Sequence, residues 1–350
     1  MKRMDNPIYK VVIVGASGFT GSELARLLVH HPAVEIMMIT SETHTGKPFS
    51  DLHPQFYGIL DMELVSASAV ENSKPDIIFL ALPHGISMDF VAKWEPLGAK
   101  IIDLSGDFRL SSPEVYENWY EKNHSYPQGF KNAIYGLPEL NADQIKDANL
   151  VANPGCYPTA SILALSPLFA RNKIQKGSVV IDAKSGLTGA GIKANATTHF
   201  SNVNENFKAY SIGSHRHTVE IEEQLSTLSQ NKVTLQFTPH LLPIDRGILV
   251  TAYASVTEEM NQEKLDKIYH EFYQDKQFIR LRKSPPGVKD VRGSHFCDIC
   301  PVWDARTQRV IVVSVIDNLL KGAASQAVHN MNLMLGLSES TGLSQIPLKP

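Results

Sequence analysis

The stretch Val11-Val12-Ile13-Val14-Gly15-Ala16-Ser17-Gly18-Phe19-Thr20-Gly21 decides the fold of this 350-residue chain. Its apolar start has the composition of a buried strand, and a helical pattern over residues 23–28 follows the glycine-rich turn. Such a turn lets the backbone approach a pyrophosphate, whose charge is favoured by the helix N-terminus. The spacing departs from G-x-G-x-x-G because two residues separate the first two glycines. We expect these residues to bind a dinucleotide: Gly15, Ser17, Gly18, Phe19, Thr20 and Gly21.

Strands and helices alternate beyond this turn. Residues 34–39, 77–81 and 101–104 have strand patterns, and residues 86–94 have a helical one. The alternation predicts a Rossmann-type doubly wound parallel sheet over residues 1–155, completed by a C-terminal helix over residues 320–350. Beyond about residue 155, long strand-like runs predict a second α+β domain over 156–319 with a largely antiparallel or mixed sheet. These runs are residues 178–183, 233–237, 248–256 and 310–316.

The composition limits the class of protein. Hydrophobic residues make up 43% of the chain, charged residues 20%, and the formal net charge is −3, which gives no support for a nucleic-acid partner. No apolar run reaches the roughly 18 residues of a membrane span, and residues 1–7 lack the apolar core of a signal peptide. Three cysteines, an odd number, argue against a disulfide framework. We expect a cytoplasmic protein with reduced thiols and a small-molecule substrate.

Residues 153–159, Asn-Pro-Gly-Cys-Tyr-Pro-Thr, place one cysteine at the start of a predicted helix. Residues 159–165 have helix-forming composition, and Pro158 suits a first helical position because no backbone donor is needed there. Cys156 would then lie beside the positive end of the helix, which can lower the pKa of a thiol below its reference of about 8.5. A cysteine in an apolar stretch is also commonly a small buried side chain. This segment alone leaves both interpretations open.

Thr40 and Ser41 occupy the end of the second predicted strand, where an NAD site usually places Asp or Glu to hold the ribose diol. Hydroxyl groups can donate to a 2′-phosphate that a carboxylate would repel, and Lys47 lies close by in the sequence. We therefore predict NADP as the cofactor. Glu42 is the residue that argues against this prediction.

Residues 213–220 concentrate two imidazoles, a guanidinium and a carboxylate. His215 and His217 are expected to share one face of an extended segment, a spacing that also occurs in zinc sites. No third ligand is identifiable, so we expect no metal. The pattern leaves open acid–base chemistry on an acidic substrate and a structural histidine pair.

Two loops and one cysteine pair complete the candidate residues. Residues 184–191 follow a predicted strand and can offer N–H groups to an anion or to the nicotinamide end of a cofactor, which makes Ser185 and Gly186 candidates for cofactor binding. Arg109 ends the run 103–109 at the carboxyl edge of the sheet, where it can bind a substrate carboxylate or form a structural ion pair. Arg216 is the second candidate for substrate binding. Cys297 and Cys300 form one C-x-x-C without a second pair, and we expect a structural role.

Together these motifs resemble the N-acetyl-γ-glutamyl-phosphate reductase family, which is related to aspartate-semialdehyde dehydrogenase. The cysteine and histidine motifs are highly specific, whereas the glycine turn is shared with many dehydrogenases. One departure is Val219, where the family typically has proline, but no reacting group is changed. The resemblance covers nearly the whole chain, through residues 15–21, 103–109, 136–139, 153–159, 185–191, 215–220 and 317–324.

The resemblance implies a function. N-acetyl-L-glutamyl 5-phosphate would be reduced with NADPH to N-acetyl-L-glutamate 5-semialdehyde, a step of arginine biosynthesis, through a thioester on Cys156. His217 would be the acid–base, Asn318 would lie near the nicotinamide, and residues 156–319 would form the catalytic and dimerisation domain of a homodimer or homotetramer. The alternatives are aspartate-semialdehyde dehydrogenase, a carrier-protein-linked acyl-phosphate reductase, and a noncatalytic NADP-sensing regulatory protein.

Overall fold

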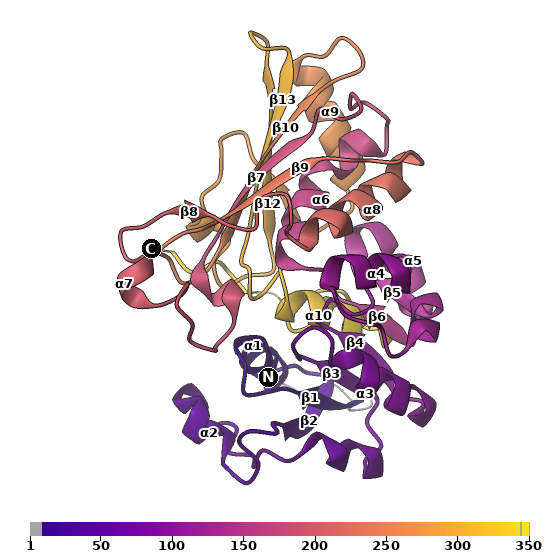
Figure 1. Cartoon of the computed structure of the whole chain (residues 1–350), viewed down its shortest axis with the longest axis vertical. Coiled ribbons are helices and arrows are strands. Elements are labelled where there is room, and N and C mark those ends of the chain that lie inside the picture. The colour runs from indigo at the N-terminus through magenta and orange to yellow at the C-terminus, as the bar shows by residue number, and fades with distance from the viewer. Residues whose placement is uncertain (1–8, 344, 350) are drawn as a thin grey trace. The chain divides into compact units, whose positions relative to one another are not determined.

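The structure is a computed structural model that describes residues 9–343 and 345–349. The chain divides into two compact units, residues 1–155 with 323–344 and residues 156–322 with 345–350 (Figure 1). Within the described ranges, no helix is long and apolar enough to cross a membrane. The expectation about a signal peptide falls on residues 1–7, which lie outside the described residues.

The first unit contains a six-stranded parallel sheet. In sheet order the strands are β2 (Val34–Thr40), β1 (Tyr9–Val14), β3 (Ile77–Leu80), β4 (Lys100–Asp103), β6 (Leu150–Ala152) and β5 (Ala133–Tyr135). The four central strands are mostly apolar and buried, as expected for a sheet covered on both faces, whereas the two edge strands, β2 and β5, are half-buried over most of their length. The strand order reverses between β1 and β3. Open α/β sheets bind ligands at such a switch point, beside the carboxyl ends of the strands.

The helices of the first unit include one that the chain supplies from its C-terminal end. Helix α10 packs against α1, α5 and β4, and every one of its residues is buried. Two amide side chains fix it, because Gln326 and Asn330 both donate to the carbonyl of Gly136 at 2.9 Å. The helices are α1 (Phe19–Leu28), α2 (Phe49–Leu52), α3 (Ser87–Trp94), α4 (Pro113–Tyr120), α5 (Pro138–Asp147) and α10 (Ala324–Met334).

The second unit is built on a seven-stranded mixed sheet. Helices α6, α8 and α9 gather on one side of it, with α6 packed against β10, β13 and both other helices (Figure 1). The strands, in sheet order, are β11 (Ile279–Leu281), β12 (Cys297–Asp304), β13 (Arg309–Ile316), β10 (Ile248–Ser255), β7 (Val180–Ser185), β9 (Gln236–Leu241) and β8 (Lys208–Ala209). The helices are α6 (Cys156–Phe169), α7 (Phe200–Val203), α8 (His217–Ser229) and α9 (Gln262–Tyr273). The fold class predicted from the sequence is thus confirmed in both units.

Helix α6 is apolar on all sides, and all of its residues after Cys156 are buried. Pro167 lies inside it and has no N–H for the carbonyl four residues earlier, that of Leu163. The hydroxyl of Tyr273, from α9, donates to this carbonyl instead, and Tyr269 donates to the carbonyl of Ala164 at 2.6 Å. The proline is therefore tolerated because a neighbouring helix replaces the missing donor.

Several elements differ from expectation. Helix α6 begins at Cys156 rather than at Pro158, since the first turn of a helix needs no proline N–H. The segment around His215 is not extended, because the chain turns there and α8 begins at His217. The C-terminal helix covers only Ala324–Met334, and the tail joins the second unit, where Lys349 bonds Asp290 at 2.6 Å.

Candidate active site

The glycine turn of the first unit is shaped by close backbone approaches. Gly15 has φ +84°, and a Cβ there would lie 2.4 Å from the carbonyl oxygen of Ala81, which follows β3. A Cβ on Gly21 would lie 2.5 Å from the Gly15 carbonyl oxygen, so neither position accepts a side chain. A Cβ on Gly18 would meet only the Gly15 carbonyl oxygen, at 3.8 Å, and Gly18, the N-cap residue of α1, has no side chain to cap the helix. An uncapped helix start with a bare backbone fits the pyrophosphate of a dinucleotide.

The residues expected to choose between the two nicotinamide cofactors lie beside this turn. The Ser41 hydroxyl donates to that of Ser17 at 3.1 Å, and the Thr40 carbonyl accepts from the Ala16 N–H at 2.9 Å. The Glu42 carboxylate accepts from the N–H of Ala67 at 2.7 Å, at the start of a 3-10 helix. The Glu42 carboxylate, which argued against NADP, therefore has a structural role as acceptor for this main-chain N–H.

Cys156 is the first residue of α6, in the second unit. It is half-buried, whereas Cys297 and Cys300 are buried on β12. The first turn of α6 carries no acidic residue, so the helix dipole acts on the thiol without opposition from a neighbouring carboxylate in that turn. A Cβ added to Gly322 would lie 2.8 Å from Cys156 Cβ, which places the backbone of the 317–322 turn directly against the cysteine.

Aromatic rings surround the residue after the cysteine. The ring of Tyr157 meets those of His215 at 5.7 Å, His217 at 6.0 Å and Phe237 at 5.4 Å between centroids. Its hydroxyl donates to the His240 carbonyl at 3.1 Å, and burial raises its pKa. Tyr157 thereby brings the first turn of α6 and the first residue of α8 into one cluster.

The two histidines have different roles in the geometry. His215 Nδ1 accepts the main-chain N–H of His217 at 3.1 Å, and the ring centroids are 4.8 Å apart. Burial, together with the positive charge of Arg216, lowers the pKa of His215 to about 4. His215 is therefore a neutral imidazole near pH 7 that accepts a main-chain N–H at the start of α8.

In the loop after β7, the N–H groups of Gly186, Leu187 and Thr188 donate to carbonyls of residues 244–247 at 2.9–3.1 Å. These three groups are therefore engaged within the second unit, and cofactor binding by Ser185 and Gly186 stays a prediction. Gly186 is required there because a Cβ would lie 2.7 Å from the Asp245 carbonyl oxygen. The Ser185 hydroxyl donates to the Gly186 carbonyl at 2.9 Å.

Arg109 and Arg216, the two expected substrate-binding residues, lie in different surroundings. Arg109 is buried in the first unit, where Nε donates to the Asn153 carbonyl at 2.7 Å and Nη2 to the Leu104 carbonyl at 2.7 Å. Asn153 is also held by Asn330, whose Nδ2 donates to its Oδ1 at 3.0 Å. Arg109 thus fixes the segment that leads along the chain to Cys156. Arg216, in contrast, is exposed at the start of α8.

Cys297 and Cys300 both lie on β12. The Sγ of Cys297 is 3.4 Å from the Ser314 hydroxyl of β13. Within residues 9–343 and 345–349, no group of three or more His, Cys, Asp and Glu side chains is arranged to hold a metal ion.

Both the sequence and the fold of this chain are similar to those of known proteins. Residues 10–148 match the model of the semialdehyde dehydrogenase NAD binding domain, and residues 156–318 match the semialdehyde dehydrogenase dimerisation domain. N-acetyl-γ-glutamyl-phosphate reductase of Halothermothrix orenii is 48% identical and that of Pelobacter propionicus 49%, each over 97% of this chain and 99% of the relative. The chain belongs to the N-acetyl-γ-glutamyl-phosphate reductase family. It is an oxidoreductase, and the resemblance drawn from the sequence motifs is confirmed.

Solved structures share the fold of this reductase family member at low identity. Aspartate semialdehyde dehydrogenase II of Vibrio cholerae has a TM-score of 0.71 at 17% identity, covering 94% of this chain and 98% of that one. The enzyme of Francisella tularensis has a TM-score of 0.69 at 14% identity, covering 94% and 100%. The matched domain models support a nicotinamide cofactor for the first unit and oligomerisation through the second.

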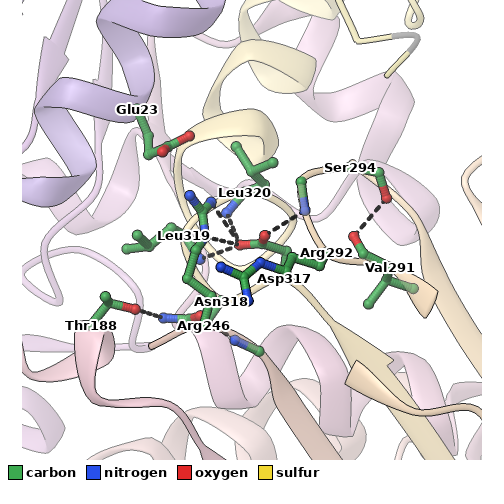
Figure 2. A network of polar contacts seen from close by, with 12 residues as sticks. Glu23, Thr188, Arg246, Val291, Arg292, Ser294, Asp317, Asn318, Leu319 and Leu320 are labelled. Atoms are coloured by element: carbon green, nitrogen blue, oxygen red, sulfur yellow. Dashed lines mark hydrogen bonds and ion pairs between the residues drawn. The ribbon is translucent and has the colours of Figure 1, made fainter. Parts of the chain in front are cut away.

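Sequence patterns did not show three features of this reductase site. The capping role of His215 depends on a turn that the pattern gave as extended. The packing of Gly322 against Cys156 joins residues far apart in the chain. The hydrogen bonds of Asp317, a residue noted only as part of a family motif, come from several segments (Figure 2).

Proposed function

We propose that this chain reduces N-acetyl-L-glutamyl 5-phosphate to N-acetyl-L-glutamate 5-semialdehyde and phosphate, with NADPH, in arginine biosynthesis. The observation that carries the proposal is the position of Cys156, half-buried at the first residue of α6 and next to the ring cluster that includes His217. Full-length relatives with this activity in their names support the choice of substrate.

Cys156 is the proposed nucleophile. Its thiolate attacks the carbonyl carbon of the acyl phosphate, a carbon–sulfur bond forms, and the carbon–oxygen bond to phosphate breaks with its electron pair leaving on phosphate. The product of this step is a thioester on Cys156. The N-terminus of α6 favours both the thiolate and the oxyanion that develops during the attack.

His217 is the proposed acid–base. A bound reduced nicotinamide would supply the hydride that converts the thioester into a thiohemiacetal, and His217 would give a proton to the oxyanion. When the thiohemiacetal collapses, His217 takes the hydroxyl proton back, the carbon–sulfur bond breaks with its electron pair leaving on sulfur, and the aldehyde and the Cys156 thiolate are released. Proton transfer of this kind commonly contributes about 10²–10⁴-fold to the rate. The neutral state of His215 supports this division of roles.

NADP is the proposed cofactor. The turn at Gly15, Ser17, Gly18, Phe19, Thr20 and Gly21 would hold the pyrophosphate, and the hydroxyls of Thr40 and Ser41 would face the 2′-phosphate side. The bond between Glu42 and the Ala67 N–H supports this choice, because the carboxylate is held by the main chain. Ser185, Gly186 and Asn318 would bind on the nicotinamide side, and Arg109 and Arg216 remain the proposed substrate-binding residues. We further propose a cytoplasmic homodimer or homotetramer.

The proposal is tested in the reverse direction. Purified protein is mixed with NADP⁺, phosphate and N-acetylglutamate 5-semialdehyde, and the absorbance of the reduced nicotinamide is followed. Phosphate-dependent reduction with the acetylated aldehyde, and a lower KM for NADP⁺ than for NAD⁺, are expected. A preference for aspartate semialdehyde in a parallel assay would assign the activity to the sister enzyme instead.

If neither aldehyde leads to reduction of NADP⁺, the result would favour the carrier-linked reductase or the NADP-sensing protein. A titration of Cys156 separates these two, because a sensor needs no thiolate near neutral pH. Acylation of Cys156 by a carrier-bound acyl phosphate would identify the carrier-linked enzyme.

A further inference from the structure

Asp317 follows β13 and is fully buried, and hydrogen-bond donors from three segments meet on its carboxylate (Figure 2). Oδ1 accepts the main-chain N–H of Leu319 at 3.0 Å and of Leu320 at 3.1 Å. The Nη2 of Arg246 donates to the same oxygen at 3.0 Å, and the N–H of Gly293 donates to Oδ2 at 2.8 Å. These bonds fix the turn that leaves the strand, from residue 317 to residue 322.

This turn presents two groups to the proposed site. The Asn318 carboxamide is fixed at both ends, because Oδ1 accepts the Gly247 N–H at 2.7 Å and Nδ2 donates to the Thr188 hydroxyl at 3.0 Å. The N–H of Gly322 donates to the Asp317 carbonyl at 3.0 Å and closes the turn. A Cβ on Gly322 would lie 2.8 Å from Cys156 Cβ and 2.5 Å from the Asn318 carbonyl oxygen.

We propose that Asp317 is a positioning residue for the reaction. Its carboxylate sets the shape of the 317–322 turn, and the turn holds the Cys156 side chain through the backbone of Gly322 and the Asn318 carboxamide through its own main chain. This inference rests on the proposed roles of Cys156 and Asn318. A misplacement of about 1 Å in an active site can reduce the rate by about 10²-fold, so such a device has a measurable effect.

A second aspartate of the same unit separates positioning from simple stabilisation. Asp298, on β12, is also fully buried, and it pairs with Arg280 Nε at 2.5 Å and Arg282 Nη1 at 2.6 Å. Neither of these pairs involves the 317–322 turn. Both aspartates are expected to stabilise the unit, since removing one partner of a buried ion pair leaves the other without compensation.

The experiment compares Asp317→Asn with Asp298→Asn in the full chain. Asparagine keeps the shape but loses the charge, and its NH₂ group must face either the Gly293 N–H or the two N–H groups of the turn. We expect kcat of Asp317→Asn to fall by about 10²-fold per folded molecule, with the dissociation constant of NADPH changed by less than about threefold. Asp298→Asn is expected to lower the melting temperature while kcat stays within about threefold of wild type.

Gly322→Ala perturbs the same contact without touching the aspartate. It is expected to reduce kcat by a similar factor, whereas Gly177→Ala, at an exposed turn with nothing within 4 Å of the added Cβ, is expected to leave kcat within about threefold of wild type. A wild-type kcat in folded Asp317→Asn or in Gly322→Ala would overturn the inference, as would equal kcat losses in the two aspartate variants. Turnover retained by Cys156→Ser would instead overturn the proposed function.

Discussion

Two turns, one in each unit, keep their shapes by different means. The turn at residues 15–21 is shaped by sterics, because a Cβ at Gly15 or Gly21 would come within 2.5 Å of a backbone oxygen. The turn at residues 317–322 also excludes a side chain at Gly322, but in addition it is held by hydrogen bonds to one carboxylate, that of Asp317. Two of the donors, Gly293 and Arg246, lie 24 and 71 positions away from Asp317 in the sequence.

The difference between the two turns shows which structural constraints can be predicted from a sequence. A position that excludes every side chain must be glycine, so steric closeness leaves a readable pattern in a short stretch. A carboxylate that collects distant donors leaves one aspartate, a residue that is common in any chain. Each prediction below tests whether the two turns serve separate tasks, binding in the first unit and chemistry in the second.

The largest expected effect is that of Cys156→Ser, which removes the chemistry of the second unit and leaves the first unit unchanged. A hydroxyl is a far poorer nucleophile than a thiolate, so turnover is expected to fall by at least about 10³-fold. NADPH binding, measured by the fluorescence of the nucleotide, is expected to stay within about threefold of wild type. A joint loss of binding and turnover would show that the two tasks are not separable.

Gly15→Ala is the converse change, in the turn of the first unit. The added Cβ would lie 2.4 Å from the Ala81 carbonyl oxygen at φ +84°, so the backbone must move. We expect NADPH to bind at least about tenfold more weakly, a loss of about 1.4 kcal/mol. Isothermal titration calorimetry measures this change.

Gly58→Ala is the matched control for that variant. It lies in the same unit with φ +72° and nothing within 4 Å of the added Cβ. It carries only the cost of a left-handed conformation, about 1 kcal/mol of stability. If both variants weaken NADPH binding equally, the close approach at Gly15 is not what shapes the cofactor site.

The dependence of stability on pH tests the neutral imidazole of the second unit. The folded protein lowers the pKa of His215 to about 4, whereas the unfolded chain takes up this proton near the ordinary value of 6.5. The stability from His215 is therefore present above about pH 6.5 and is lost as the pH falls towards 4. For this partly exposed group we expect about 1–2 kcal/mol, seen as a falling melting temperature.

His215→Asn should reduce that slope, because the carboxamide oxygen can replace Nδ1 as acceptor for the His217 N–H and has no proton to gain. His30→Asn, at an exposed histidine of the first unit, is the control. An unchanged slope between pH 7 and pH 5 in His215→Asn would contradict the assignment.

The smallest expected effect is that of Ser41→Asp, beside the glycine turn. A carboxylate there would repel a 2′-phosphate and accept from a ribose hydroxyl, so the ratio of kcat/KM for NADPH over NADH is expected to fall by about fivefold. Ser68→Asp, at a serine outside the turn, should leave that ratio unchanged. A rise of the ratio in Ser41→Asp would indicate that position 41 does not face the 2′-phosphate.

The sequence predicted the parallel sheet, the glycine turn and the place of Cys156 near a helix start, because each is recorded within a few residues. It could not predict that His215 caps α8, since a spacing of two residues suits both a strand and the turn that is found. It gave the 186–188 amides as open, because their acceptors at residues 244–247 follow β9, far away in the chain. Apart from the turn at His215, the features of the site that the sequence did not predict are those that depend on contacts between segments far apart in the chain.

The pair of Pro167 and Tyr273 has a consequence for descent. If Tyr273 is replaced by phenylalanine in a relative, the Leu163 carbonyl loses the donor that Tyr273 supplies. A residue other than proline at position 167 would compensate, because its main-chain N–H can donate to this carbonyl. We therefore expect the two positions to covary among relatives, with phenylalanine on α9 tolerated mainly where α6 has lost its proline. The contact between the two helices therefore constrains evolution, because the loss of Pro167 must precede or accompany the loss of the Tyr273 hydroxyl.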